Sequence, residues 1–445
     1  MTHGEPDTIE VQEHEPSGPA GTPVHNDQKV TWLELFFDLI FVVAFDQLAK
    51  RLGDSPQLEN LGEFGLMFTA VWWAWAGNTM LAARYGNETR AYRWGTVAQL
   101  VSMGMLALTL RGDLKDTGMA FALAYGTNRV LQVVMHFALA REVPGGAPFA
   151  QQSSAPLALA AGVWLISAWL PGGSTLQILL WCAALLADMI IPVVIQARVG
   201  NAHSSLPHEG HLPERVGLLQ IIALGAIVTE VVNGSRQQEM NLVTLAPALS
   251  AILLTVALWR LYFDQARTLP LLGAHVEGQV QRMQAWLYGH LPFTLSVVML
   301  GVGLGHGLSG VDAKKDAVNQ QFVAWPLASA FLTLCFLRWN SRRVARQRGM
   351  DRSLMAMWAG AFGAAAVGFI DLDTVQLHAL VAVLTVGASL IVATDPATRR
   401  LGKLEEEVTE QLDEGEAPET IVQELADPSD EISANPPTNI ETRSS

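Results

Sequence analysis

The chain has 445 residues, of which 50% are hydrophobic and only 16% are charged, and its formal net charge is −14. Soluble domains carry about 25% charged residues, and the apolar residues here gather in runs of about 17–25, the length that spans a bilayer. This composition excludes an ordinary soluble domain. The chain also lacks a basic stripe interleaved with aromatic residues, which argues against a nucleic-acid partner. We therefore expect an all-α polytopic membrane protein whose first partner is the lipid bilayer.

The two ends of the chain differ in composition from the middle. Residues 1–28 are rich in Pro, Gly, Glu and Asp and lack the basic and apolar regions of a signal peptide, so we expect a disordered acidic tail. Residues 29–396 form the expected transmembrane helical domain. Residues 397–445 are acidic and expected to be mostly disordered, with one or two helical turns at the amphipathic patch 404–408.

Hydropathy predicts about twelve transmembrane helices. They are expected at about 30–49, 61–82, 94–110, 117–140, 155–170, 174–195, 215–233, 241–265, 284–306, 321–338, 354–370 and 376–394. An even number places both termini on one side, and the loops of that side carry the excess of Lys and Arg that marks the cytoplasm. Similar polar and aromatic edges in the first and second six spans favour two six-helix repeats, and chance likeness between apolar helices is the alternative.

The first span carries three acids, Glu34, Asp38 and Asp46. At about 100° per residue they share one arc of the helix. A carboxylate inside a bilayer costs about 2.5 kcal/mol or more, so this arc must face protein or water. The pattern predicts a proton or cation site at Glu34 and Asp38, with a structural ion pair as the alternative. Asp46 is a secondary candidate, since it could equally be a solvated residue at the end of the span.

The fourth span contributes a base, Arg129, deep within an apolar run. We expect it to pair with Glu34, Asp38 or Asp188, as a structural partner more than as a ligand contact. His136 lies on the same helix face and is a secondary candidate for proton relay, with a core histidine as the alternative.

Two later spans add further candidates. Asp188 lies four residues before Pro192, which frees the carbonyl of Asp188 and suggests either a cation site or a kink with a paired acid. Glu214 and Arg215 stand at the start of the seventh span, where an acid complements the helix dipole, and are secondary candidates. Glu230 lies deeper in that span and is a primary candidate.

The histidines give weaker signals. His290 in the ninth span is a secondary candidate. His203, His208 and His211 are spaced loosely in the expected sixth loop and fit ordinary loop histidines better than metal ligands. We expect no metal and no cofactor.

A charge count inside the spans favours protons or cations over anions. We count several acids against a single deep base, Arg129. The acids are Glu34, Asp38, Glu63, Asp188 and Glu230. Uncompensated negative charge inside a bilayer requires protons, cations or a wet cavity.

Three sequence blocks resemble the bacterial low-temperature-requirement A family. They are W-L-E-L-F-F-D-L at 32–39, H-L-P-E-R-V-G-L-L-Q-I-I-A-L-G at 211–225 and Y-G-H-L-P at 288–292. The resemblance covers about residues 28–395. The family usually places Glu after the Leu-Gly of the second block, where this chain has Ala226, with Glu230 one helical turn later. The resemblance implies a multi-pass protein of the bacterial inner membrane, and it implies no reaction or substrate.

The sequence favours a non-enzymatic role. We expect cation- or proton-linked transport or conduction through a helix bundle with buried acids, so that the partner is a small cation or a proton-coupled solute. The alternative is a structural or sensory membrane protein without turnover. An intramembrane lipid-modifying enzyme is less favoured, because the spans lack Gly-x-Ser-x-Gly, His-Asp motifs and clustered ligands. Nothing in the sequence fixes an oligomeric state.

Overall fold

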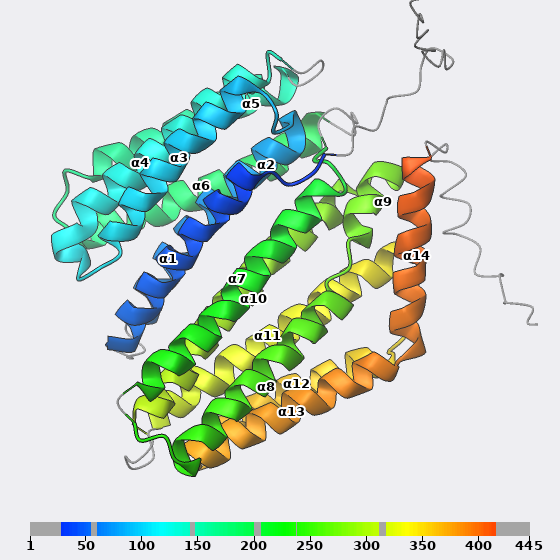
Figure 1. Cartoon of the computed structure of the whole chain (residues 1–445). Coiled ribbons are helices and arrows are strands. Elements are labelled where there is room, and N and C mark those ends of the chain that lie inside the picture. The colour runs from blue at the N-terminus through cyan, green and yellow to red at the C-terminus, as the bar shows by residue number, and fades with distance from the viewer. Residues whose placement is uncertain are drawn as a thin grey trace, which may run out of the picture.

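The computed structural model describes residues 28–54, 60–142, 147–199, 206–236, 238–310 and 317–414. Every regular element in these ranges is a helix (Figure 1). The helices are α1 (Trp32–Asp54), α2 (Leu61–Tyr85), α3 (Arg90–Thr109), α4 (Leu114–Leu139), α5 (Ala147–Ser167), α6 (Thr175–Val199), α7 (His211–Ser235), α8 (Leu242–Gln265), α9 (Leu269–Glu277), α10 (Val280–Ser309), α11 (Ala317–Val344), α12 (Arg352–Val367), α13 (Thr374–Thr394) and α14 (Pro396–Asp413). Most of the two expected tails, residues 1–27 and 415–445, lies outside the described residues.

Local chemistry fixes several helix ends. The Thr89 side chain accepts a hydrogen bond from the backbone N–H of Tyr92 and begins α3. Asp373 and Gln376 form a reciprocal capping box at the start of α13. Gly278 ends α9 with φ 69°, in the left-handed region that glycine adopts without strain. Such caps satisfy backbone groups that have no partner within the helix.

Helices α1 to α8 and α10 to α13 coincide in order and position with the twelve expected spans. Six described segments are long and apolar enough to cross a membrane: Thr175–Ile195, His211–Ser235, Leu242–Glu277, Val280–Ser309, Val318–Val344 and Thr374–Thr394. Other helices fall short of that standard for identifiable reasons. Helix α1 carries several charged residues, and α12 has only 16 residues.

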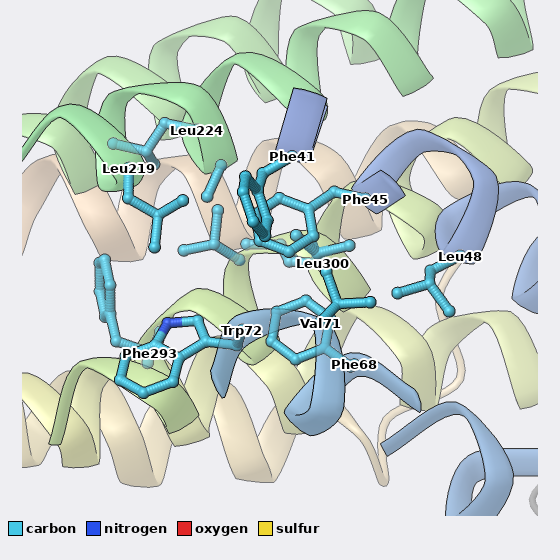
Figure 2. Close-up of a cluster of buried hydrophobic side chains, with 14 of the residues drawn as sticks. Phe41, Phe45, Leu48, Phe68, Val71, Trp72, Leu219, Leu224, Phe293 and Leu300 are labelled. Atoms are coloured by element: carbon cyan, nitrogen blue, oxygen red, sulfur yellow. The ribbon is translucent and has the colours of Figure 1, made fainter. Parts of the chain in front are cut away.

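Helices α1 and α2 lie between two groups of helices (Figure 1). Helices α3 to α6 form one group and α7 to α13 the other, and α1 contacts α2, α3, α7 and α10. Figure 2 shows the apolar core at this junction, where Phe41 and Phe45 of α1 meet Phe68 and Trp72 of α2 and Leu300 of α10. The rings of Phe45 and Phe68 stack with centroids 5.1 Å apart. This packing fixes the rotation of α1 and therefore the direction of its acids.

Helix α9 was not expected, and α14 is longer than expected. Helix α14 extends well beyond the one or two turns expected near residue 404, because it packs on α9 and does not stand alone in water. Leu401 and Val408 of α14 are buried with Leu272 of α9. Glu405 of α14 also accepts a hydrogen bond of 2.9 Å from the backbone N–H of Thr268, the residue before α9. The start of α1 and helices α9 and α14 lie at the same end of the bundle (Figure 1).

Candidate functional site

The first buried site joins α1 to α7. We call Glu34, Asp38, His211 and Arg215 the Arg215 cluster. The Arg215 guanidinium donates to Glu34 Oε1 at 2.9 Å and to Asp38 Oδ1 at 2.6 Å, and its Nε donates to Asp38 Oδ2 at 3.1 Å. His211 Nε2 lies 3.0 Å from Glu34 Oε1. Glu34 and Arg215 are fully buried, and Asp38 is 1% exposed.

Further donors complete this site. Asn87 donates to Glu34 Oε2 at 2.8 Å, and the Tyr92 hydroxyl donates to Glu34 Oε1 at 3.0 Å. The indole N–H of Trp75 donates to Asp38 Oδ1 at 2.8 Å. Each carboxylate oxygen therefore accepts at least one hydrogen bond, which is the condition under which buried charges are tolerated. These hydrogen bonds join the Arg215 cluster on α1 and α7 to α2, α3 and the α2–α3 turn.

Matched spacing builds the Arg215 cluster. Glu34 and Asp38 are four residues apart on α1, and His211 and Arg215 are four residues apart on α7, so each pair projects from one helix face. The expectation for His211 was wrong, because it is a buried residue of α7 and not a loop histidine. Arg215 lies near the start of α7 next to the exposed Glu214, as expected, but its side chain turns inward. The four-residue spacing within each pair was the sequence signal that could have predicted that the two acids meet the two basic residues.

The second buried site joins α4 to α6. Of the three acids expected to pair with Arg129, the structure places Asp188 against it, with Nε and Oδ2 2.9 Å apart. Arg129 is 5% exposed and Asp188 is fully buried. Arg129 also donates to the side chain of Gln132, which in turn donates to the carbonyl of Ala74 on α2 at 2.8 Å. Neither oxygen of Asp188 has a hydrogen bond of good geometry with a described residue.

A cavity of about 70 Å³ lies beside this pair, between α2, α4, α6 and α10. We call it the Arg129 cavity. Its polar lining consists of Arg84, Arg129, Gln132, His136, Asp188, Gln284 and Tyr288. Apolar side chains such as Trp73 and Leu287 form much of the remaining wall, and Pro192 also lines it. The expected candidates Arg129, His136 and Asp188 therefore share one cavity, whereas Glu34 and Asp38 lie in the other site.

The remaining candidates lie apart from both sites. Glu230 is half-buried near the end of α7, where its backbone packs against Gly305 of α10. Asp46 is bound by Lys50 at 2.6 Å, and Glu214 is exposed. The ring of buried His290 has Nδ1 2.7 Å from the carbonyl of Trp286 and packs edge-on against that indole. Among the described residues, no three His, Cys, Asp or Glu side chains lie close enough to hold a metal ion.

The expected excess of buried acids is wrong. Arg215 is fully buried and Arg338 is 1% exposed, so Arg129 is not the one deep base. Arg338 donates to Asp351 at 2.6 Å near the end of α11. Glu63 pairs with Arg51. Sequence placed Arg215 and Arg338 near span ends, where basic side chains normally reach water, and only the helix packing turns them inward.

A comparison with protein families decides the identity of the chain. The family model described as "Bacterial low temperature requirement A protein (LtrA)" matches residues 29–389. The chain belongs to the LtrA family. A relative of this LtrA protein, named "Uncharacterized protein RA0937" from Rhizobium meliloti (strain 1021), is 27% identical over 288 residues, which cover 62% of this chain and 68% of the relative. No solved structure matches this LtrA chain. The protein is thus a multi-pass membrane protein with buried acid–base pairs.

Proposed function

We propose that twelve helices, α1 to α8 and α10 to α13, cross the cytoplasmic membrane of a bacterium. Helices outside the six most apolar segments also present exposed apolar side chains, as a lipid-facing surface requires. Examples are Phe36 and Val43 on α1, Val101 on α3, Val134 on α4 and Ile166 on α5, which are between 49% and 73% exposed.

Both termini lie in the cytoplasm in this proposal. Exposed basic side chains gather at the end of the bundle where α9 and α14 lie, among them Arg343, Arg348, Arg399 and Lys403. Basic loops are retained in the cytoplasm. A cysteine placed at Arg348 should react with a membrane-impermeant maleimide only after cells are opened, and labelling of intact cells would reverse the orientation.

The same proposal includes two six-helix repeats. In the first half α1 contacts α2 and α3, and α2 contacts α4 and α6. In the second half α7 contacts α8 and α10, and α8 contacts α11 and α13. The third to sixth helices of each half also contact one another consecutively. This parallel pattern supports duplication, a known plan of secondary transporters.

We propose that the protein carries out proton-linked transport of a small solute and no enzymatic reaction. The observation that carries this proposal is the Arg129–Asp188 ion pair beside a cavity between helices. An ionisable pair inside a membrane protein is costly and commonly marks a proton or substrate path. Asp188 is the carboxylate among the described residues that line the cavity, so it is the group that would carry the proton. Coordination of a bare cation by Glu34 and Asp38 has less support, because donors from Arg215 and Asn87 already occupy their oxygens.

Flux measurements in proteoliposomes test this function. Wild type and Asp188→Asn would receive gradients of H⁺, Na⁺ and K⁺ in turn, with internal pH and membrane potential as readouts. We expect internal pH to change in wild-type proteoliposomes when a defined solute is added to the outside. We expect no such change in Asp188→Asn. Asp264→Asn is the matched control, because Asp264 lies at the half-exposed end of α8 in a 3.6 Å pair with Arg260. Proton flux that survives in Asp188→Asn would contradict the proposal.

A structural or sensory role is the second candidate, and the closed Arg215 cluster favours it. A buried network in which every carboxylate oxygen is hydrogen-bonded holds helices in one arrangement and leaves no carboxylate oxygen open to a ligand. If this role is the whole function, Asp38→Asn should impair folding or partner binding, and no variant should change a flux. A proton flux that wild type shows and a folded Asp188→Asn protein loses would exclude it.

A further inference from the structure

The Arg129 cavity has the charge pattern of an anion site that a carboxylate already occupies. Arg84 and Arg129 contribute two guanidinium groups to its lining, and Asp188 contributes one carboxylate. The other titratable lining groups are His136 on α4 and Tyr288 on α10. Helices α5 and α7 contribute Leu157 and Leu212, which carry no charge. Tyr125 of α4 also acts electrostatically on Arg129 and Asp188.

The pair couples a proton to an anion. If Asp188 takes up a proton, Arg129 loses the negative charge 2.9 Å away while it remains 5% exposed. A buried charge without a counter-charge is strongly unfavourable. An anion that enters the adjacent cavity restores that counter-charge. Protonation of Asp188 and binding of an anion to Arg129 therefore favour one another, and each step without the other leaves an unbalanced charge.

The cavity limits which anion can bind. Protonation of one carboxylate releases one positive charge, so the anion is monovalent. An engineered apolar cavity of about 150 Å³ binds benzene, which has six non-hydrogen atoms, so a volume of about 70 Å³ suits an anion of about three or four non-hydrogen atoms. Arginine binds a carboxylate with two parallel N–H donors. The apolar wall formed by Trp73, Met80 and Leu287 suits a short alkyl group and disfavours a strongly hydrated ion.

We propose that the Arg129 cavity binds a small monocarboxylate together with a proton on Asp188, so that the solute moves as a neutral pair. This inference rests on the proposed role of Asp188 as the proton-carrying group. The proton goes to an Asp188 oxygen, the carboxylate takes the place of Asp188 at the Arg129 guanidinium, and no covalent bond forms or breaks. Release on the other side returns the ion pair to its starting state.

Equilibrium binding is the direct test, because undissociated short acids cross lipid on their own and obscure a flux. Sodium acetate would be titrated calorimetrically into the full-length protein in detergent between about pH 5 and about pH 8. We expect affinity to fall about tenfold for each unit of pH above the titration of Asp188, with about one proton taken up per acetate in buffers of different ionisation enthalpy. Sulfate should give no binding heat. Acetate binding without pH dependence or proton uptake would overturn the proposal, and so would the absence of acetate binding across the whole range.

Two variants sharpen this test. Asp188→Asn imitates the protonated acid, so acetate should bind tightly at every pH. Arg129→Gln removes the guanidinium, so acetate should not bind at any pH, and wild-type affinity in this variant would overturn the proposal. The pH series and the proton count use wild-type protein, so the test does not depend on the folding of either variant. Asp188-dependent proton flux without acetate binding would overturn this inference alone, whereas acetate binding without any proton flux would overturn the proposed transport function.

Discussion

In the Arg215 cluster each oxygen of Glu34 and Asp38 accepts a hydrogen bond of good geometry, whereas in the Arg129 cavity Asp188 has the ion pair of its Oδ2 with Arg129 and no hydrogen bond of good geometry from a described residue. Both sites contain an arginine and carboxylate that are nearly or fully buried. They differ in the number of donors and in the space beside the pair. The comparison teaches that burial of opposite charges does not itself mark a functional site. A network whose carboxylate oxygens are all hydrogen-bonded stabilises one helix arrangement. An ion pair with few hydrogen bonds beside a cavity can separate when a ligand takes the place of one member.

The largest expected loss of stability comes from removing Arg215 from the Arg215 cluster. Arg215→Gln leaves Glu34 and Asp38 without a counter-charge, and loss of one partner of a buried pair costs about 3–5 kcal/mol. We expect a large drop in the thermal unfolding midpoint of the detergent-solubilised protein and loss of its monodisperse peak in size-exclusion chromatography. Glu214→Gln is the matched control, because this neighbouring side chain is exposed and should change neither measurement. If Arg215→Gln were as stable as wild type, the Arg215 cluster would not be the stabilising network that distinguishes it from the Arg129 cavity.

The next prediction compares the loss of stability caused by the same isosteric Asp→Asn substitution in the two sites. Asp38→Asn replaces an oxygen that accepts bonds from Arg215 and Trp75, whereas Asp188→Asn replaces an oxygen with no hydrogen bond of good geometry. Asp188→Asn also leaves Arg129 without a counter-charge, whereas Arg215 keeps Glu34 in Asp38→Asn. The comparison is therefore made in saturating acetate, which supplies that counter-charge, and there we expect the loss of unfolding free energy in Asp188→Asn to be about half of that in Asp38→Asn, or less. Chemical denaturation of both variants measures the ratio. Equal losses would show that the Arg129–Asp188 pair is as much a structural lock as the Arg215 cluster.

Helix positions could be predicted because a bilayer demands a long apolar run, and most bounds of α1 to α8 and α10 to α13 lie within about five residues of those expected. Helix α5 begins eight residues before its expected start at 155, and α11 ends six residues after its expected end at 338. Helices α9 and α14 escaped prediction because they are stabilised by contact with each other. That contact includes the bond from Thr268 to Glu405, which lie 137 residues apart. The stabilisation that such a long-range contact provides cannot be read from the local sequence of either helix.

The burial of four charged side chains could be predicted more readily than their partners. Unusual charges in apolar runs pointed to Glu34, Asp38, Arg129 and Asp188, and all four are buried. Four-residue spacing shows that two side chains share a helix face, but it does not show which helix that face meets. The assignment of Arg215 to Glu34 and Asp38 depends on the packing of α1 against α7. The cavity beside Arg129 depends on four helices at once and has no counterpart in the sequence pattern.

A third cluster tests whether bonding controls stability outside the membrane as well. Asp395, which caps α14, accepts hydrogen bonds from the Ser353 hydroxyl at 2.6 Å, the Ser353 backbone N–H at 2.9 Å and the Ala397 backbone N–H at 3.1 Å. Burial alone would raise the pKa of this carboxyl group. The hydrogen bonds and the nearby Arg338 guanidinium outweigh burial and hold the pKa of Asp395 below its ordinary value.

The lowered pKa of Asp395 determines how its contribution to folding stability changes with pH. Because the pKa of Asp395 is lower in the folded protein than in the unfolded chain, its stabilising effect is complete above the ordinary pKa of about 3.9 and is lost as the pH falls through the folded value. Asp395→Ala should cost about 1–2 kcal/mol, a typical loss for a helix cap. Hydrogen exchange of α14 amides should rise in this variant and should no longer depend on the Asp395 titration. The exposed Glu406 of α14 is the control position, and a similar effect of Glu406→Ala would argue against the cap.

The smallest expected effect concerns the shape of the cavity without any change of charge. A Cβ added to Gly77 of α2 would lie 2.5 Å from the amide nitrogen and oxygen of Gln132, closer than real contacts permit. Gln132 is the side chain that links Arg129 to Ala74, so Gly77→Ala must shift it within the cavity wall.

Gly65→Ala supplies the matched comparison on the same helix, because a Cβ there meets nothing within 4 Å. We expect Gly77→Ala to weaken acetate binding by about threefold to tenfold and to change the unfolding free energy by less than about 1 kcal/mol, since the displaced atoms end a flexible side chain. Gly65→Ala should leave acetate affinity at the wild-type value and raise the unfolding free energy by about 0.5–1 kcal/mol, the gain in helix propensity of Ala over Gly. If the two variants bind acetate equally well, the position of Gln132 does not matter and the guanidinium acts without help from its neighbour. If only Gly77→Ala is impaired while its stability is kept, the Arg129 cavity is sensitive to geometry in the way that a binding site is and a structural ion pair is not.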